Sequence, residues 1–180
     1  MALRFALLAA LHEQPGTGYE LTRHFRHRQA HVWNASHQQI YRELAKLHGD
    51  GLLAMQTIPQ SDKPDRKRYA LTVAGEAALR DWLATPQPRP PTRDPLLVKL
   101  FAGDCLDDTA MAKELAGLRR HYQRQLATFE EIRATWFLHP ESLPRHYRLQ
   151  YLALRRGIRS ATDWLGWLEE LEDAFDSGGA

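Results

Sequence analysis

Cysteine is almost absent from this sequence. Cys105 is the single cysteine among 180 residues, so no disulfide can form within the chain and a reducing cytoplasm is the expected compartment. No apolar stretch approaches the roughly 20 residues that cross a bilayer. The apolar opening MALRFALLAALHEQP turns polar at His12 and shows no cleavage site of a signal peptide. We expect a soluble, cytoplasmic protein with no membrane partner.

The chain also lacks the short motifs of common enzyme classes. It has no Gly-rich phosphate loop, no nucleophile elbow and no HExxH stretch. Its Asp and Glu pairs fall where helix surfaces are expected. With 43% hydrophobic and 26% charged residues, the composition is that of an ordinary globular protein with one medium domain or two small ones. We therefore expect no enzymatic activity and no cofactor.

The net charge is small, at +2, and by itself does not indicate a nucleic-acid partner. The distribution of charge is more informative, because the basic excess lies in the first 84 residues. There it forms two islands, Arg23 to Lys46 and Lys63 to Arg68. Local basic islands in a nearly neutral chain are typical of a surface that contacts phosphates.

A proline-rich segment, TPQPRPPTRDP, divides the chain at residues 85–95. Closely spaced prolines fix φ and remove backbone donors, so this segment cannot be a regular helix. It predicts an extended linker. The expected organisation is a first domain at 1–84, the linker at 85–95, and a second, helical domain at 96–180.

The first domain shows the order of a winged helix-turn-helix. Three helical patterns are followed by two short strand patterns, Leu52 to Pro59 and Arg66 to Thr72, joined by a polar turn. Thr72 then caps a fourth helix. The predicted order α-α-α-β-β-α places the third helix in the DNA major groove and the hairpin, the wing, near the adjacent backbone or minor groove.

The third helix of this domain has two different faces. Its apolar positions recur at helical spacing, at Ile40, Leu44 and Leu47. The opposite side carries polar residues one turn apart, at Gln38, Arg42 and Lys46. Ser36 is expected to cap the helix start, and the glycines at 49 and 51 to end it. The outward face is either solvated or reads DNA.

Chemistry and domain order favour the reading role for this face. Glutamine amides pair bidentately with adenine, and arginine pairs with guanine, whereas a solvated polar face is the general alternative for any surface helix. Tyr41 lies at the stripe edge, where a core ring and a hydroxyl that meets a phosphate are equally compatible with the pattern. The expected DNA contacts of this helix are Ser36, His37, Gln38, Gln39, Tyr41, Arg42 and Lys46.

The wing supplies the second set of candidates. In a strand, Arg66 and Arg68 share one face and Lys67 lies on the other, so the three cannot all follow one phosphate track. A merely solubilising turn is the alternative. We expect the phosphate contacts of the wing to be Lys63, Arg66 and Arg68.

The second domain changes to long helical patterns. Apolar residues alternate at spacings of four and three, at Tyr147, Tyr151, Leu154, Ile158, Ala161, Leu165 and Leu168. This period is close to 3.5 residues and predicts a coiled-coil-like helix pair. Further apolar residues widen the face beyond one seam, at Leu152, Trp164, Trp167 and Leu171. A second copy of the chain is the simplest partner, so we expect an antiparallel long-helix dimerisation domain and a homodimer.

Several stretches together resemble one family. They are GYEL at 18–21, QIYREL at 39–44, LHGDGLL at 47–53, RKRYALTVAG at 66–75, RDPLLVKLFAGD at 93–104 and WLEELE at 167–172. The chain is similar to PadR-like transcriptional regulators, in the branch with a virulence-activator-like C-terminal domain. The resemblance implies a mainly α, dimeric winged-helix protein that binds double-stranded DNA at a pseudo-palindromic operator, often as a repressor released by a small aromatic or hydrophobic ligand. Arg42 stands where many relatives have proline, which leaves the target sequence open.

Three further patterns carry weaker hypotheses. His24, His27 and His31 share one helix face and suit a transition metal. No Cys or carboxylate cluster lies near them in sequence, so we expect no metal site, and a metal-responsive regulator is an alternative.

An effector pocket is expected at Trp136, Phe137, Trp164 and Trp167, although aromatic residues at helical spacing are more often plain core. A winged helix that binds only protein is the last alternative, and the basic wing argues against it.

Overall fold

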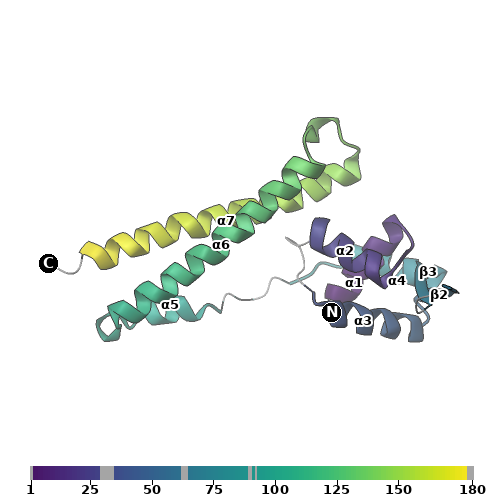
Figure 1. Cartoon of the computed structure of the whole chain (residues 1–180), viewed down its shortest axis with the longest axis horizontal. Coiled ribbons are helices and arrows are strands. Elements are labelled where there is room, and N and C mark those ends of the chain that lie inside the picture. The colour runs from purple at the N-terminus through teal and green to yellow at the C-terminus, as the bar shows by residue number, and fades with distance from the viewer. Residues whose placement is uncertain (1, 29–34, 62–64, 89–90, 92, 178–180) are drawn as a thin grey trace. The chain divides into compact units, whose positions relative to one another are not determined.

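The structure, a computed structural model, describes residues 2–28, 35–61, 65–88, 91 and 93–177. Contacts divide the chain into two compact units, 1–88 and 89–180 (Figure 1). The first unit holds a winged helix and the second is helical, as expected of a mainly α protein. Within the described residues, no helix has the length and apolar character needed to span a membrane.

The first unit follows the predicted order of elements. They are α1 (Ala2–Glu13), α2 (Gly18–Arg28), α3 (His37–Gly49), β2 (Leu53–Ile58), β3 (Arg66–Leu71) and α4 (Val73–Ala84). One element was not predicted, the two-residue strand β1 (Gly16–Thr17) between α1 and α2. It pairs antiparallel with β3, which gives a three-stranded sheet in the order β1-β3-β2.

The core of this unit forms around α1. Leu7 and Leu8 of α1 are fully buried, and they share one apolar cluster with the α3 stripe Ile40, Leu44 and Leu47, each at 0% exposure. On the other side of α1, Phe5 stacks on Trp82 of α4 with ring centroids 4.7 Å apart. Since α3 is anchored by its apolar stripe, its opposite face is left for solvent or a ligand.

A compact junction joins the end of α3 to the wing and to α4. Gly51 has a φ of +75°, and the amides of Gly51 and Leu52 donate to the carbonyls of His48 and Leu47, both at 3.0 Å. This is the Schellman arrangement, which glycine favours because it lacks a Cβ. Thr72 caps α4 by accepting from the Gly75 amide at 3.0 Å, and its hydroxyl donates to the Gly51 carbonyl at 2.8 Å.

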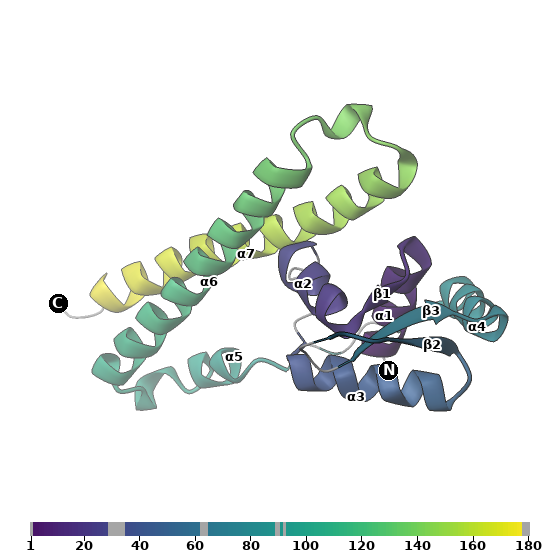
Figure 2. The same ribbon diagram turned by 45° about the vertical axis from the view of Figure 1, so that its right-hand side comes forward.

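The second unit is a long helical hairpin with a short helix before it. Its elements are α5 (Pro95–Leu100), a 3₁₀ turn (Gly103–Cys105), α6 (Asp108–Trp136), a second 3₁₀ turn (Pro140–Ser142) and α7 (Arg145–Ser177). Figure 2 shows α6 and α7 running antiparallel to each other. The residues at the centre of the predicted α7 seam, Leu154, Ala161 and Leu168, are fully buried.

Two separate apolar clusters hold the hairpin together. One comprises Leu96, Met111, Leu115 and Leu168, and the other comprises Phe129, Ile132, Phe137 and Leu154. At the end of the hairpin that holds the first cluster, Arg119 of α6 donates to Glu172 at 3.1 Å and to Glu169 at 3.4 Å. Hydrogen bonding to Glu172 is the main cause that raises the pKa of Arg119 above its ordinary value.

Candidate nucleic-acid interface

The start of α3 is closed by a capping box. The Gln39 amide donates to Ser36 Oγ at 3.2 Å, and the Ser36 amide donates to Gln39 Oε1 at 2.9 Å. These bonds satisfy two donors that a helix start otherwise leaves unpaired. Two of the predicted DNA contacts therefore have a structural task already, although the Gln39 Nε2 and the Ser36 hydroxyl can still donate.

The outer face of α3 presents the other predicted readers. Gln38, Arg42 and Lys46 are exposed. Among the described residues, none of these three side chains forms a hydrogen bond or an ion pair with the rest of the unit. They lie one turn apart, opposite the buried stripe, and Figure 2 shows α3 along the edge of the winged-helix unit. An α-helix fits the major groove of B-DNA, so this face suits contact with base edges.

Tyr41 is neither a fully buried core ring nor a fully exposed side chain. Its ring packs on Gly18 at the start of α2, where a Cβ would lie 2.7 Å from Tyr41 Cζ. The His37 ring lies on it, with centroids 4.2 Å apart. Even so, Tyr41 remains 40% exposed. The ring thus braces α3 against α2, and its outer edge is accessible together with His37.

The wing presents its arginines as the strand pattern predicts. In the β2–β3 ladder, Arg66 pairs with Ile58 and Arg68 pairs with Gln56. Arg66 and Arg68 project from the face opposite buried Tyr69, because strand side chains alternate. Burial raises the pKa of the Tyr69 hydroxyl above its ordinary value. Both arginines are exposed, whereas Lys63 lies outside the described residues.

Glu20 was not identified from the sequence. It stands in the first turn of α2, where its Oε2 accepts from the Thr17 amide at 2.8 Å and from the Thr17 hydroxyl at 3.0 Å, while the Glu20 amide donates back to Thr17 Oγ1 at 3.2 Å. This is a second capping box. The hydrogen bond from the Thr17 amide is the main cause that lowers the pKa of Glu20, and Arg68 and Arg66 lower it further. The spacing T-x-x-E is a known signal and would have revealed it.

The histidine pattern falls mostly outside the described part of the chain. His24 lies in α2, but His31 and the side chain of His27 fall outside what the structure describes. Within the described residues, no group of three or more His, Cys, Asp or Glu side chains is placed to hold a metal ion.

The four aromatic residues predicted to bind an effector are not brought together within the chain. Phe137 is buried near Leu154, and the neighbouring Trp136 is 48% exposed. Trp164 stacks instead on Tyr122, with centroids 4.9 Å apart, and belongs with Trp167 to the other cluster of the hairpin. Phe137 thus belongs to one cluster, Trp164 and Trp167 pack against the other, and Trp136 belongs to neither.

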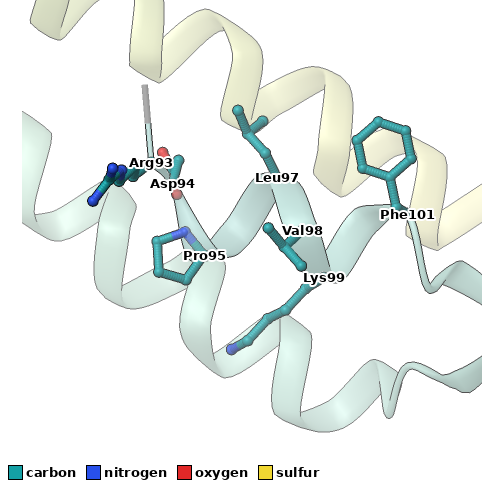
Figure 3. Close-up of a pocket in the computed structure, with 7 residues that line it drawn as sticks. All are labelled: Arg93, Asp94, Pro95, Leu97, Val98, Lys99 and Phe101. Carbon is teal, nitrogen blue, oxygen red and sulfur yellow. The ribbon is translucent and has the colours of Figure 1, made fainter. Parts of the chain in front are cut away.

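A shallow apolar hollow lies along α5. Figure 3 shows the residues that line it, Arg93, Asp94, Pro95, Leu97, Val98, Lys99 and Phe101. Phe101 is 95% exposed and Val98 is 70% exposed. Adjacent large apolar side chains are rarely so exposed on a protein surface that has no binding partner.

Comparisons with known proteins agree with this architecture. Residues 7–81 match the family described as Transcriptional regulator PadR-like, and residues 92–176 match the family described as Virulence activator alpha C-term. Probable transcriptional regulator Rv1176c from Mycobacterium tuberculosis is 36% identical, with 97% of this chain and 98% of that protein covered. The negative transcriptional regulator PadR from Bacillus subtilis is 29% identical, with 97% of each covered.

Solved structures extend the likeness to the whole chain. The Vibrio cholerae virulence activator AphA is 30% identical with a TM-score of 0.83, covering 98% of this chain and 99% of that one. Bacillus subtilis PadR in complex with operator DNA is 26% identical with a TM-score of 0.78, covering 97% and 99%. The same protein in complex with p-coumaric acid is 25% identical with a TM-score of 0.74, covering 98% and 99%.

Proposed function

The chain belongs to the PadR-like family of transcriptional regulators, and from this premise we propose that it is a cytoplasmic repressor that binds a pseudo-palindromic operator as a homodimer and leaves it when a small aromatic or hydrophobic effector binds. DNA binding and transcriptional regulation follow from the family, and the chain is not an enzyme. The observation that carries the proposal is the outer face of α3, where Gln38, Arg42 and Lys46 are exposed and uncommitted.

In this proposal the two elements of the interface have different tasks. The α3 face reads base edges, with Gln38 and Arg42 as the principal readers and His37, Tyr41 and Lys46 beside them. Arg66 and Arg68 of the wing, with Lys63, contact phosphates and add affinity without sequence information. Ser36 and Gln39 hold the helix end in place and contribute at most a donor each.

The proposed dimer rests first on exposed apolar surface. Large apolar side chains of the second unit remain exposed, at Val98, Phe101, Trp136, Leu138, Leu149 and Leu152. A second copy of the unit would remove this surface from water. Two copies related by a two-fold axis would also present two α3 helices to successive major grooves, about 34 Å apart.

The charges of α7 favour an antiparallel arrangement of that dimer. Its first half has only basic charges, at Arg145, Arg148, Arg155, Arg156 and Arg159. Its second half has only acidic charges, at Asp163, Glu169, Glu170, Glu172, Asp173 and Asp176. Antiparallel pairing of two copies sets each basic half against an acidic half, whereas parallel pairing sets like charges together.

The exposed face of α7 also has a regular spacing of charged and apolar residues. Arg145, Leu149, Leu152, Arg156, Arg159 and Asp163 recur at spacings of four and three, opposite the seam that packs on α6. Leu149 and Leu152 are about half exposed on this face. This face therefore has the spacing of a second helix contact, and within the described residues nothing covers Leu149 and Leu152.

The dimer is tested by sedimentation at micromolar concentration. We expect wild-type protein to sediment as a dimer and the double variant Arg156→Glu, Arg159→Glu to shift toward monomer. Adding Asp163→Lys and Glu170→Lys to that variant restores opposite charges in the antiparallel arrangement and is expected to restore the dimer. A monomeric wild type, or a double variant that dimerises as well as wild type, contradicts the arrangement.

For the effector we propose the aromatic pairs of the second unit, Trp136 with Phe137 and Trp164 with Trp167. The complex of Bacillus subtilis PadR with p-coumaric acid supports this chemical class. The stacked rings of Tyr122 and Trp164 offer a flat apolar surface of the kind that a phenolic ring packs on.

The whole proposal is tested by a mobility-shift titration against DNA from upstream of the protein's own gene. We expect a salt-sensitive shift that p-coumaric acid weakens, together with quenching of tryptophan fluorescence that Trp164→Phe reduces. If the protein shifts the DNA but no small aromatic acid weakens that binding, the proposed effector is wrong and the proposed DNA binding stands.

A further inference from the structure

Two helices of the winged-helix unit begin with the same cap but differ in one charge. In α3 the residue that reaches back to the cap is neutral Gln39, and in α2 it is the carboxylate Glu20. The macrodipole favours a negative charge at both helix starts, yet α3 does without one. The cap of α3 forms with a neutral oxygen acceptor, so a capping box can do without a charge, although the cap of α2 stabilises the ionised form of Glu20.

The register of the sheet places this carboxylate beside the arginines of the wing. Thr17 is the partner of Arg68 in the β1–β3 ladder. Directly opposed residues of an antiparallel pair project from the same face, with Cβ atoms about 4.5–5.5 Å apart. Glu20 is bound to both the amide and the hydroxyl of Thr17. Arg66 lies two residues before Arg68 in β3 and on the same face, so the carboxylate lies at the Arg68 end of this arginine pair.

The arginines of this row remain available to a phosphate. Within the described residues, neither Arg66 nor Arg68 closes an ion pair, and both are exposed. By contrast, Arg4, Arg80 and Arg119 are each held by a carboxylate within 4.0 Å. The pKa of Glu20 is lowered chiefly by the hydrogen bond from the Thr17 amide, and the charges of Arg68 and Arg66 lower it further.

We infer that Glu20 limits the attraction of the wing for DNA phosphates, as a fixed negative charge beside Arg68 and Arg66. The inference rests on the DNA-binding role proposed above. A phosphate that reaches Arg68 also meets the repulsion of this carboxylate. Across roughly 7 Å of water, one unit charge changes the binding constant by about threefold. The sequence-independent part of the affinity is thereby kept low, so that base contacts decide where the protein stays.

The test is Glu20→Gln, because Gln39 performs the same capping task in α3. The probes are a duplex of about 30 base pairs from upstream of the protein's own gene and a scrambled duplex of the same length, titrated over a salt series. We expect Glu20→Gln to bind both duplexes about threefold more tightly at low salt, with the gain fading as salt rises. In an Arg66→Ala, Arg68→Ala background the gain should shrink.

Glu76→Gln is the matched control. Glu76 is also an acid in the first turn of a helix, α4, but its partner is Arg80 at 3.1 Å. The control removes the same net charge, and we expect the affinity for DNA to change less than for Glu20→Gln. Equal effects of the two variants, or unchanged affinity for Glu20→Gln, would overturn the inference.

Thermal unfolding of each variant distinguishes an effect of the lost charge on DNA binding from an effect of a weakened helix cap on stability. If Glu20→Gln unfolds more readily and binds both duplexes more weakly, Glu20 is structural and the inference is overturned. If the wild-type protein binds neither duplex, both the proposed operator binding and the inference are overturned. If the wild type binds and Glu20→Gln has no effect, only the inference is overturned.

Discussion

The ring of Tyr41 lies over the Cα of Gly18, so closely that a Cβ at that position would stand 2.7 Å from Tyr41 Cζ. Gly18 is the first residue of α2 and Tyr41 belongs to the second turn of α3. The contact sets how near the two helices of the helix-turn-helix approach each other. Glycine leaves the space that the Tyr41 ring occupies, and its φ is not positive.

The first prediction follows from this contact. Gly18→Ala forces the Tyr41 ring or the α3 axis to move, and overpacking of this kind costs about 1–3 kcal/mol. Urea unfolding measures the loss, and we expect operator affinity to fall with it. Gly49→Ala is the control, because nothing lies within 4 Å of a Cβ at that position. A Gly18→Ala protein as stable as the control would show that the contact does not constrain α3.

The second prediction separates two adjacent glutamines. Gln39→Ala removes half of the capping box and should lower the free energy of unfolding by about 0.5–1 kcal/mol. Gln38→Ala should leave stability unchanged and lower the affinity for the cognate duplex alone by about 1–3 kcal/mol. Unfolding and binding are measured on both variants. Equal losses on cognate and scrambled duplexes for Gln38→Ala would mean that this face is not the reader.

The third prediction concerns the wing. Arg66→Ala and Arg68→Ala should each weaken binding to every duplex alike and lower the salt slope by about one, because phosphates carry no sequence. Lys67→Ala is the internal control, since Lys67 projects from the opposite face of β3. Titrations on cognate and scrambled DNA across a salt series measure both quantities. A loss confined to the cognate duplex would assign base contacts to the wing.

The fourth prediction is the dependence of stability on pH. The pKa of Glu20 is lowered in the folded protein, chiefly by the hydrogen bond from the Thr17 amide. A carboxyl with a lowered folded pKa contributes stability above its unfolded pKa and loses it as the pH falls through the folded pKa. Wild-type stability should thus decline below about pH 5 more steeply than that of Glu20→Gln. Parallel curves from pH 7 to pH 3 would show that the carboxylate is not stabilised by folding.

Long periodic patterns predicted the architecture well, and the caps predicted at Ser36 and Thr72 are confirmed, whereas the short strand β1 was missed. The stripe at Ile40, Leu44 and Leu47 and the seam through Leu154, Ala161 and Leu168 define helices, because burial imposes the helical period on many residues. The strand β1 has two residues, which are too few to show a period. Its partner β3 lies about 50 residues away along the chain, so only the folded chain reveals the pairing.

Ser36 was predicted to cap α3, but the part that Gln39 has in the same cap was not predicted, so the division of tasks among these residues was incomplete. Sequence placed Ser36, Gln38 and Gln39 together on one helix start, and all three have the chemistry of DNA contacts. The fold commits two of them to the capping box. The pattern S-x-x-Q was visible beforehand and would have separated them. The split of the aromatic residues has a different cause, because it depends on where α7 returns along α6.

That division of tasks has a consequence for how this regulator diversifies. Ser36 and Gln39 secure the helix while Gln38, Arg42 and Lys46 make no polar contact with the described fold, so exchanges at these three surface positions leave folding nearly untouched. If these three residues read the operator as proposed, their substitution changes which DNA is bound while the buried stripe of α3 and its cap stay as they are. A change of target then requires no repacking of the core.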